Sequence, residues 1–108
     1  MSAYASYVKL TAKPGQRDSL VELMLEAAAG METVEGCELY VINLSVSEPD
    51  SIWVTEIWRN QEDHDASLKL EGAQEQIQRV LPLLAGRPEG IILQPVGGKG
   101  FIPPESVS

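Results

Sequence analysis

Glu56 and Trp58 are the residues whose types and spacing first suggest chemistry in this chain. They lie two positions apart in the strand-like run Ser51 to Arg59, so their side chains should share one face. An indole offers a flat apolar wall and one N–H donor, and a buried carboxylate can act as a general base. Alternatively, Trp58 belongs to the core and Glu56 pairs with Arg59 or Arg87.

Three further residues, His64, Ser67 and Tyr40, are candidates for the same site. The histidine can take a proton near neutral pH, but its position between two aspartates also fits a solvated surface residue. The Ser67 hydroxyl can hold a substrate oxygen or lie on a helix surface, and Tyr40 can line a cavity or pack within a sheet. We predict that Glu56 and His64 are catalytic and that Trp58, Ser67 and Tyr40 bind substrate.

Composition excludes several classes of function. The 108 residues include 16 acidic and 8 scattered basic side chains, a formal charge of −8, so we expect neither nucleic acid nor a membrane surface as a partner. Cys37 is the only cysteine, which excludes an internal disulfide and favours an inert apolar role. The chain has no Gly-x-Gly-x-x-Gly loop and no clustered histidines, so we expect no bound cofactor or metal. Because no signal-peptide pattern or membrane-length apolar run is present, we expect a cytoplasmic protein.

The first half of the chain must position Tyr40, Glu56 and Trp58. Tyr4 to Thr11 alternates like a strand, and Arg17 to Met31 carries apolar residues at helical spacing. Cys37 to Ser47 and Ser51 to Arg59 are rich in β-branched and aromatic residues and are separated by a short turn. They predict a hairpin.

The second half must position His64 and Ser67. Asn60 is a predicted cap for a helical region that reaches Leu84, with a break expected at Gly72, and Ile91 to Val96 is the last predicted strand. The resulting order, β-α-β-β-α-β, predicts an α+β ferredoxin-like fold with a four-stranded antiparallel sheet and helices on one face.

The domain is expected to span residues 1–96. Residues 97–108 are rich in glycine and proline and should form a flexible arm, with Phe101 and Ile102 as its only apolar anchors.

The predicted sheet is apolar on both faces. Leu39 and Val41 project opposite to Tyr40 in the second strand, and Trp53 projects opposite to Trp58 in the third. The helices can cover only one of these faces. We therefore expect a homodimer in which the other sheet face packs against the same face of a second copy.

From Tyr7 to Val96 the chain resembles the antibiotic biosynthesis monooxygenase family. The resemblance rests on the sequence elements Val8–Gly15, Glu35–Cys37, Trp53–Trp58 and Leu81–Leu84. It implies a dimeric α+β barrel and a monooxygenase that oxidises a small aromatic, phenolic or quinol compound without flavin, metal or haem.

The chain departs from the family pattern at one site position. Relatives often read Ala-His-Leu where this chain has Ala66-Ser67-Leu68, and His64 lies three positions earlier, nearly one helical turn away. Ile77 stands near the position at which haem-degrading relatives need histidine, so haem breakdown is not expected. Two alternatives remain open, a non-catalytic dimer that binds a small aromatic or quinoid molecule, and a proton-transfer isomerase on the same scaffold.

Overall fold

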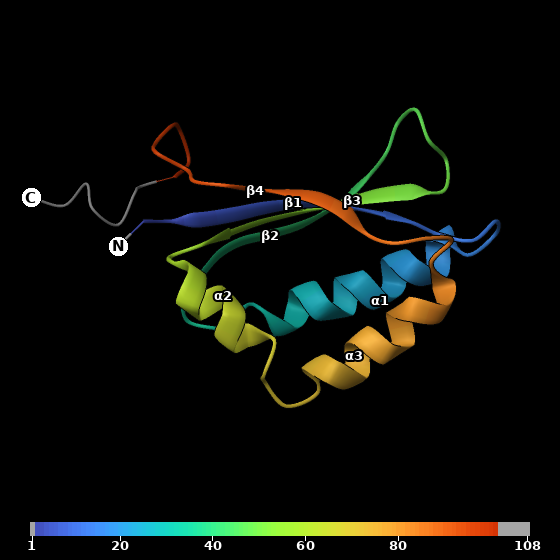
Figure 1. Ribbon diagram of the computed structural model, residues 1–108, viewed down its shortest axis with the longest axis horizontal. Helices are drawn as coiled ribbons and strands as arrows, with labels where there is room; N and C mark the ends of the chain where they lie inside the picture. The colour runs from blue at the N-terminus through green and yellow to red at the C-terminus, as the bar shows by residue number, and fades with distance from the viewer. Residues whose placement is uncertain (1, 102–108) are drawn as a thin grey trace, which may run out of the picture.

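A computed structural model describes residues 2–101 (Figure 1). In chain order, its elements are β1 (Tyr4–Thr11), α1 (Arg17–Gly30), β2 (Cys37–Leu44), β3 (Ser51–Trp58), α2 (Gln61–Ser67), α3 (Ala73–Val80), the 3-10 turn η1 (Leu81–Leu83) and β4 (Glu89–Leu93). The predicted β-α-β-β-α-β order is confirmed, and its second helical region is divided in two.

The four strands form one sheet in the order β2-β3-β1-β4, with every neighbouring pair antiparallel. Since β1 and β2 are both antiparallel to β3, they are parallel to each other, and the same argument makes β3 parallel to β4. Each parallel pair is joined through helices, and such crossovers are almost always right-handed. Figure 1 shows α1, α2 and α3 on one side of the sheet, as predicted for a ferredoxin-like fold.

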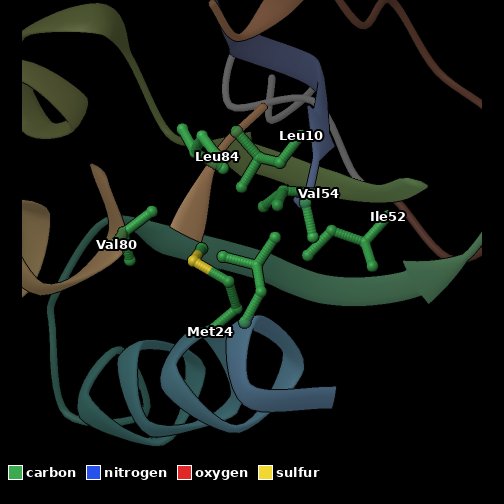
Figure 2. Close-up of a cluster of buried hydrophobic side chains, with 8 residues drawn as sticks. Leu10, Met24, Ile52, Val54, Val80 and Leu84 are labelled. Carbon is green, nitrogen blue, oxygen red and sulfur yellow. The ribbon is translucent and has the colours of Figure 1, made fainter. Parts of the chain in front are cut away.

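The core lies where α1 and α3 meet the helix-facing side of the sheet. Figure 2 shows Met24 of α1 pointing toward Leu10, Val54 and the neighbouring apolar side chains of the sheet. Leu20 and Ile52 are fully buried in the same cluster. Because Leu10 and Ile52 are register partners in β1 and β3, this end of the covered face is filled by side chains.

Local sequence divides the second helical region. The Asn60 side chain accepts a hydrogen bond from the Asp63 backbone N–H at 2.7 Å and so caps α2, as predicted. Gly72, at φ +86°, lies in the left-handed region that glycine favours and separates α2 from α3. Gln76 then donates from Nε2 to the Leu23 carbonyl at 2.6 Å, which fastens α3 to α1.

Several predicted element ends are wrong. β2 ends at Leu44 instead of Ser47, because the Ser45 hydroxyl accepts the Glu48 N–H and forms a turn. The last strand is Glu89–Leu93 instead of Ile91–Val96, because its pairing with β1 begins at Glu89 and Pro95 has no N–H to extend the ladder. Helical structure ends in η1, with Pro82 inside it, before Leu84.

The outer face of the sheet, opposite the helices, is apolar and exposed. It carries the large side chains of Tyr7, Leu39, Val41, Trp53, Ile91 and Leu93. The predicted opposition of Trp53 and Trp58 is confirmed, since Trp53 is 36 % exposed and Trp58 is 0 % exposed. The described residues after β4 reach Phe101 without another helix or strand, and Ile102, the second predicted anchor of the arm, lies outside the described residues.

Candidate functional site

A cavity of about 570 Å³ lies between the sheet and the helices. It borders the core directly, because the core residues Leu10, Met24 and Val54 are among its lining residues. Residues of β1, β2, β3, α1, α2, α3 and the α2–α3 loop line it. Most of the lining is aliphatic. Four of the five residues selected from sequence line this one cavity: Tyr40, Glu56, His64 and Ser67.

Glu56 is held by the indole of Trp58. Nε1 of Trp58 donates to Oε1 of Glu56 at 2.8 Å, a contact made easy by their i, i+2 spacing on one face of β3. Among residues 2–101 no other side chain donates to this carboxylate, so Oε2 is able to accept a hydrogen bond from a ligand. The sequence also allowed Glu56 to pair with an arginine. Arg59 does not form this pair, because it binds Asp63 at 2.7 Å.

Trp58 lies behind the cavity wall. Its side chain is fully buried and is absent from the cavity lining, although the sequence suggested a wall that contacts substrate. The reason is that its ring packs against the imidazole of His64, with centroids 5.7 Å apart and an interplanar angle of 83°. The indole therefore supports two lining residues, Glu56 through a hydrogen bond and His64 through an edge contact.

His64 is a packed residue of the cavity wall. Only 17 % of its side-chain surface is exposed, and its ring lies over Tyr4 with centroids 4.6 Å apart. The solvated-surface alternative is therefore wrong. Nδ1 lies 2.9 Å from Oδ1 of Asp65. Because an ionised carboxylate only accepts hydrogen bonds, this contact places the proton of a neutral imidazole on Nδ1 and leaves Nε2 as the basic atom.

The start of α2 is held against the loop before β2, which fixes where His64 lies. Gly36 has φ +94°, and a Cβ at this position would overlap the Asp63 carboxylate, so only glycine permits this approach. Arg59, immediately after β3, donates from Nε to the same carboxylate at 2.8 Å. These contacts join the first turn of α2 to the loop before β2.

Ser67 is buried in the cavity wall, one helical turn after His64. Its exposed fraction is 6 %, so it is not the helix-surface serine of the sequence alternative. Its hydroxyl donates to the His64 backbone carbonyl at 2.6 Å. The Ser67 hydrogen is therefore engaged within α2, and its oxygen is the atom that can still accept a hydrogen bond.

The negative charge of Glu56 helps to raise the pKa of neighbouring acidic side chains. Tyr40 is the cross-strand partner of Glu56. Burial raises the pKa of Tyr40, and the charges of Glu56 and Cys37 raise it further. Burial likewise raises the pKa of Tyr4, with added effects from Asp65 and Glu56. The Tyr40 hydroxyl therefore stays protonated at neutral pH and can donate a hydrogen bond.

Cys37 has a similar environment. Burial, followed by the Glu56 charge, raises the pKa of its thiol, so the neutral form predominates at neutral pH. This agrees with the inert role predicted from sequence.

Sequence reasoning missed three residues of the site, Tyr4, Asp65 and Glu71, which lie outside the Glu56–Trp58 motif. Tyr4 supports the imidazole because β1 pairs with β3 in a register that sets it opposite Trp58. Asp65 was treated only as a surface acid, and Glu71, in the α2–α3 loop, was not considered although it lines the cavity. Only the strand register and the helix break bring these residues to one site.

The described part of the chain has neither a metal-binding cluster of side chains nor a membrane-spanning helix. Between residues 2 and 101 no three His, Cys, Asp or Glu side chains group in a way that could hold a metal ion. No helix in that same range is both long enough and apolar enough to cross a membrane.

Comparison with known proteins places this chain in a family. Residues 3–79 match the family model described as Antibiotic biosynthesis monooxygenase. A candidate antibiotic biosynthesis monooxygenase from Chloroflexus aurantiacus is 40 % identical, over 90 % of this chain and 96 % of that chain, with a TM-score of 0.80. No curated protein sequence matches the chain.

More distant structures share the fold. A candidate member of the same group from Caulobacter crescentus is 18 % identical over 89 % of this chain and 92 % of that one, with a TM-score of 0.84. Another, from Nitrosomonas europaea, is 16 % identical over 88 % and 91 %, with a TM-score of 0.83. Because its family model and its 40 % identical relative both extend across most of its length, the chain belongs to the antibiotic biosynthesis monooxygenase family.

Proposed function

We propose that this protein is a monooxygenase that oxidises a small aromatic, phenolic or quinol compound in the 570 Å³ cavity, using no flavin, metal or haem. The observation that carries the proposal is the convergence of Glu56, His64 and Tyr40 on a mainly aliphatic cavity. Such a lining binds a flat ring by apolar contact, and a few polar groups orient its hydroxyl.

In this proposal, His64 takes the proton of the substrate hydroxyl through Nε2. The charge of Glu56 raises the pKa of Tyr40, and it should oppose the ionisation of a substrate phenol beside it in the same way. A base that becomes positive removes this difficulty, because imidazolium attracts both the new phenolate and Glu56. Glu56 therefore accepts a hydrogen bond from the substrate and stabilises the imidazolium, and His64 is the base.

The deprotonated ring supplies the electrons that dioxygen needs. The same anion is the conjugate base of the keto tautomer of the phenol, in which the ring carbon ortho or para to the oxygen is a CH₂ group. Overall this group reacts as R₂CH₂ + O₂ → R₂C=O + H₂O, so one oxygen atom enters the product, the other leaves as water, and no external reductant is required. The first electron passes from the substrate anion to dioxygen. The Tyr40 hydroxyl is positioned to donate to an oxyanion that forms in the cavity.

Three residues position the reacting groups in this proposal. Trp58 holds the Glu56 carboxylate at 2.8 Å, and Asp65 holds Nδ1 of His64 at 2.9 Å. Ser67 lies where relatives often carry histidine, and its oxygen can accept a hydrogen bond from a polar substituent.

Oxygen uptake with a panel of quinols and activated phenols tests this function. Wild-type protein should consume oxygen, Glu56→Gln and Trp58→Phe should lower the rate at least about ten-fold, and Glu22→Gln, an exposed α1 residue outside the cavity lining, should leave it unchanged. Equal rates for all four proteins would refute these roles. Saturable binding without oxygen uptake would instead support a binding dimer, and anaerobic turnover would support an isomerase.

We also propose that the protein is a homodimer joined through its outer face. Trp53, Val41 and Ile91 expose apolar surface on three neighbouring strands, and a second copy of the same face is a complementary cover for it. The cavity lies on the opposite side of the sheet, so this association would leave its helix-lined wall unchanged.

A further inference from the structure

The cavity has an uneven distribution of charge. Two carboxylates, Glu56 and Glu71, are among its lining residues, and no lysine or arginine of residues 2–101 lines it. Glu56 is half-buried in β3, and Glu71 is exposed in the α2–α3 loop. The cavity thus has one acidic group at its inner end, beside His64, and another at its solvent-facing rim.

The basic residues near the cavity do not offset these carboxylates. Arg59 binds Asp63 at 2.7 Å, and Arg79 lies 3.5 Å from Glu26 on the outer side of the helices. Lys69 and Arg87 neighbour lining residues in the sequence, but both are exposed and neither lines the cavity. A carboxylate on a ligand would therefore leave water for a site that offers it no cationic partner.

This arrangement of charges favours cationic ligands over anionic ones. Two unit charges several ångströms apart near a protein surface interact appreciably, and the interaction grows as water is excluded. A ligand anion would be repelled by both carboxylates. A ligand ammonium group that reaches the rim would be attracted by Glu71.

We propose that the cavity selects aromatic ligands that are neutral or carry an amine, and that it rejects ligands that carry a carboxylate. The proposal rests on the proposed function for the idea that the ligand is a phenol, and it adds the charge that the substrate must have. The phenol lies at the inner end, near Glu56 and His64, and a cationic substituent lies at the rim, near Glu71. The volume of about 570 Å³ accommodates a fused ring system with one such substituent.

Binding of three matched probes tests this selectivity. The probes are naphthol, its hydroxynaphthoic acid analogue and its aminomethyl analogue, which share one ring and differ in charge at neutral pH. Dissociation constants are measured by calorimetry on the full chain at low salt. We expect the amine to bind at least about ten-fold more tightly than the acid, with naphthol between them, and we expect the difference to shrink in high salt.

A pair of variants locates the source of the preference. Glu71→Gln removes a lining carboxylate, and Glu75→Gln removes an exposed carboxylate four residues later that does not line the cavity. Glu71→Gln should reduce the amine-to-acid ratio several-fold, and Glu75→Gln should change it less. Circular dichroism of both variants verifies that the fold is retained.

The outcomes separate this inference from the proposed function. Equal binding of acid and amine, or tighter binding of the acid, overturns the charge selectivity, even where oxygen uptake supports the monooxygenase. Charge-ordered binding that responds to Glu71→Gln supports the selectivity, even where no oxygen is consumed. Absence of binding by all three probes overturns both proposals.

Discussion

On the helix-facing side of the sheet, Ile52 and Val54 are 0 % and 2 % exposed, whereas Trp53, between them on the outer face, is 36 % exposed. Both faces are apolar, so hydropathy does not distinguish them. Each of the two crossover connections joins a pair of parallel strands, and both place their helices on the same side of the sheet. Within the described residues only that side is covered. One face of this sheet is therefore covered within a single chain, and the other is left exposed, which is the face that the proposed homodimer would cover.

The covered face is itself divided. At the Ile52 end, Leu20 of α1 fills the space, and neither side chain lines the cavity. At the Tyr40 and Glu56 end, the break at Gly72 turns the chain between α2 and α3, and a cavity remains between helices and sheet. The polar residues of the proposed chemistry therefore gather where packing is incomplete.

The largest expected effect is on stability at the filled end. Ile52→Ala should lower the free energy of unfolding by about 2 to 5 kcal/mol, because it opens a cavity in a packed core. Val41→Ala, which also shortens an aliphatic side chain in a strand but on the outer face, should cost about 1 kcal/mol or less. Urea unfolding at low protein concentration, where association does not contribute, measures both. Equal losses would contradict the assignment of the core to one face.

The next effect concerns the homodimer proposed to cover the outer face. Trp53→Glu should weaken dimerisation at least about a hundred-fold, because an unpaired carboxylate would be buried in an apolar interface. Val46→Glu, at a fully exposed apolar residue of the β2–β3 loop, is the matched control and should leave association unchanged. Sedimentation velocity measures both. A wild-type protein that is monomeric at micromolar concentration would exclude the homodimer.

A smaller effect is expected at Asp65, the residue that holds Nδ1 of His64. Asp65→Asn should lower kcat about ten-fold, since the amide can hold either imidazole tautomer, and binding of naphthol should not change. Asp65→Glu should recover part of the rate. Glu62→Gln, exposed on the same helix, is the control. A change in binding with unaltered kcat would assign Asp65 to the ligand instead of to His64.

The smallest expected effect is a loss of stability at alkaline pH that comes from Tyr40. The folded-state pKa of Tyr40 is raised by burial and then by Glu56, so its contribution to stability is present below the ordinary tyrosine pKa and is lost as pH rises above it. Above about pH 10, wild-type stability should fall by about 1 kcal/mol per pH unit from this residue.

Tyr40→Phe should lack this part of the loss, while Tyr7→Phe, on the outer face, controls for removal of a hydroxyl. Urea unfolding between neutral and alkaline pH provides the comparison. Identical alkaline slopes for wild type and Tyr40→Phe would contradict the assignment.

Local signals predicted most of the fold. The strand at Tyr4 to Thr11, the Asn60 cap and the break at Gly72 were predicted from short segments, and each is confirmed. The end of the last strand was wrong because it depends on pairing between β4 and β1, which are about eighty residues apart. A strand's pattern indicates its faces, but its ends depend on its neighbour.

The same distinction between local signals and contacts between distant segments applies to the site. From the sequence alone, the i, i+2 spacing of Glu56 and Trp58 determined that they share a face, and the apolar pattern determined that both sides of the sheet need a cover. Only the tertiary structure decided that Trp58 lies behind the cavity wall, that Tyr4 and Asp65 hold His64, and that Glu71 reaches the rim. The physical reason is that spacing within a strand or helix is set by local backbone geometry, whereas contacts between elements depend on strand register and helix packing across the whole chain.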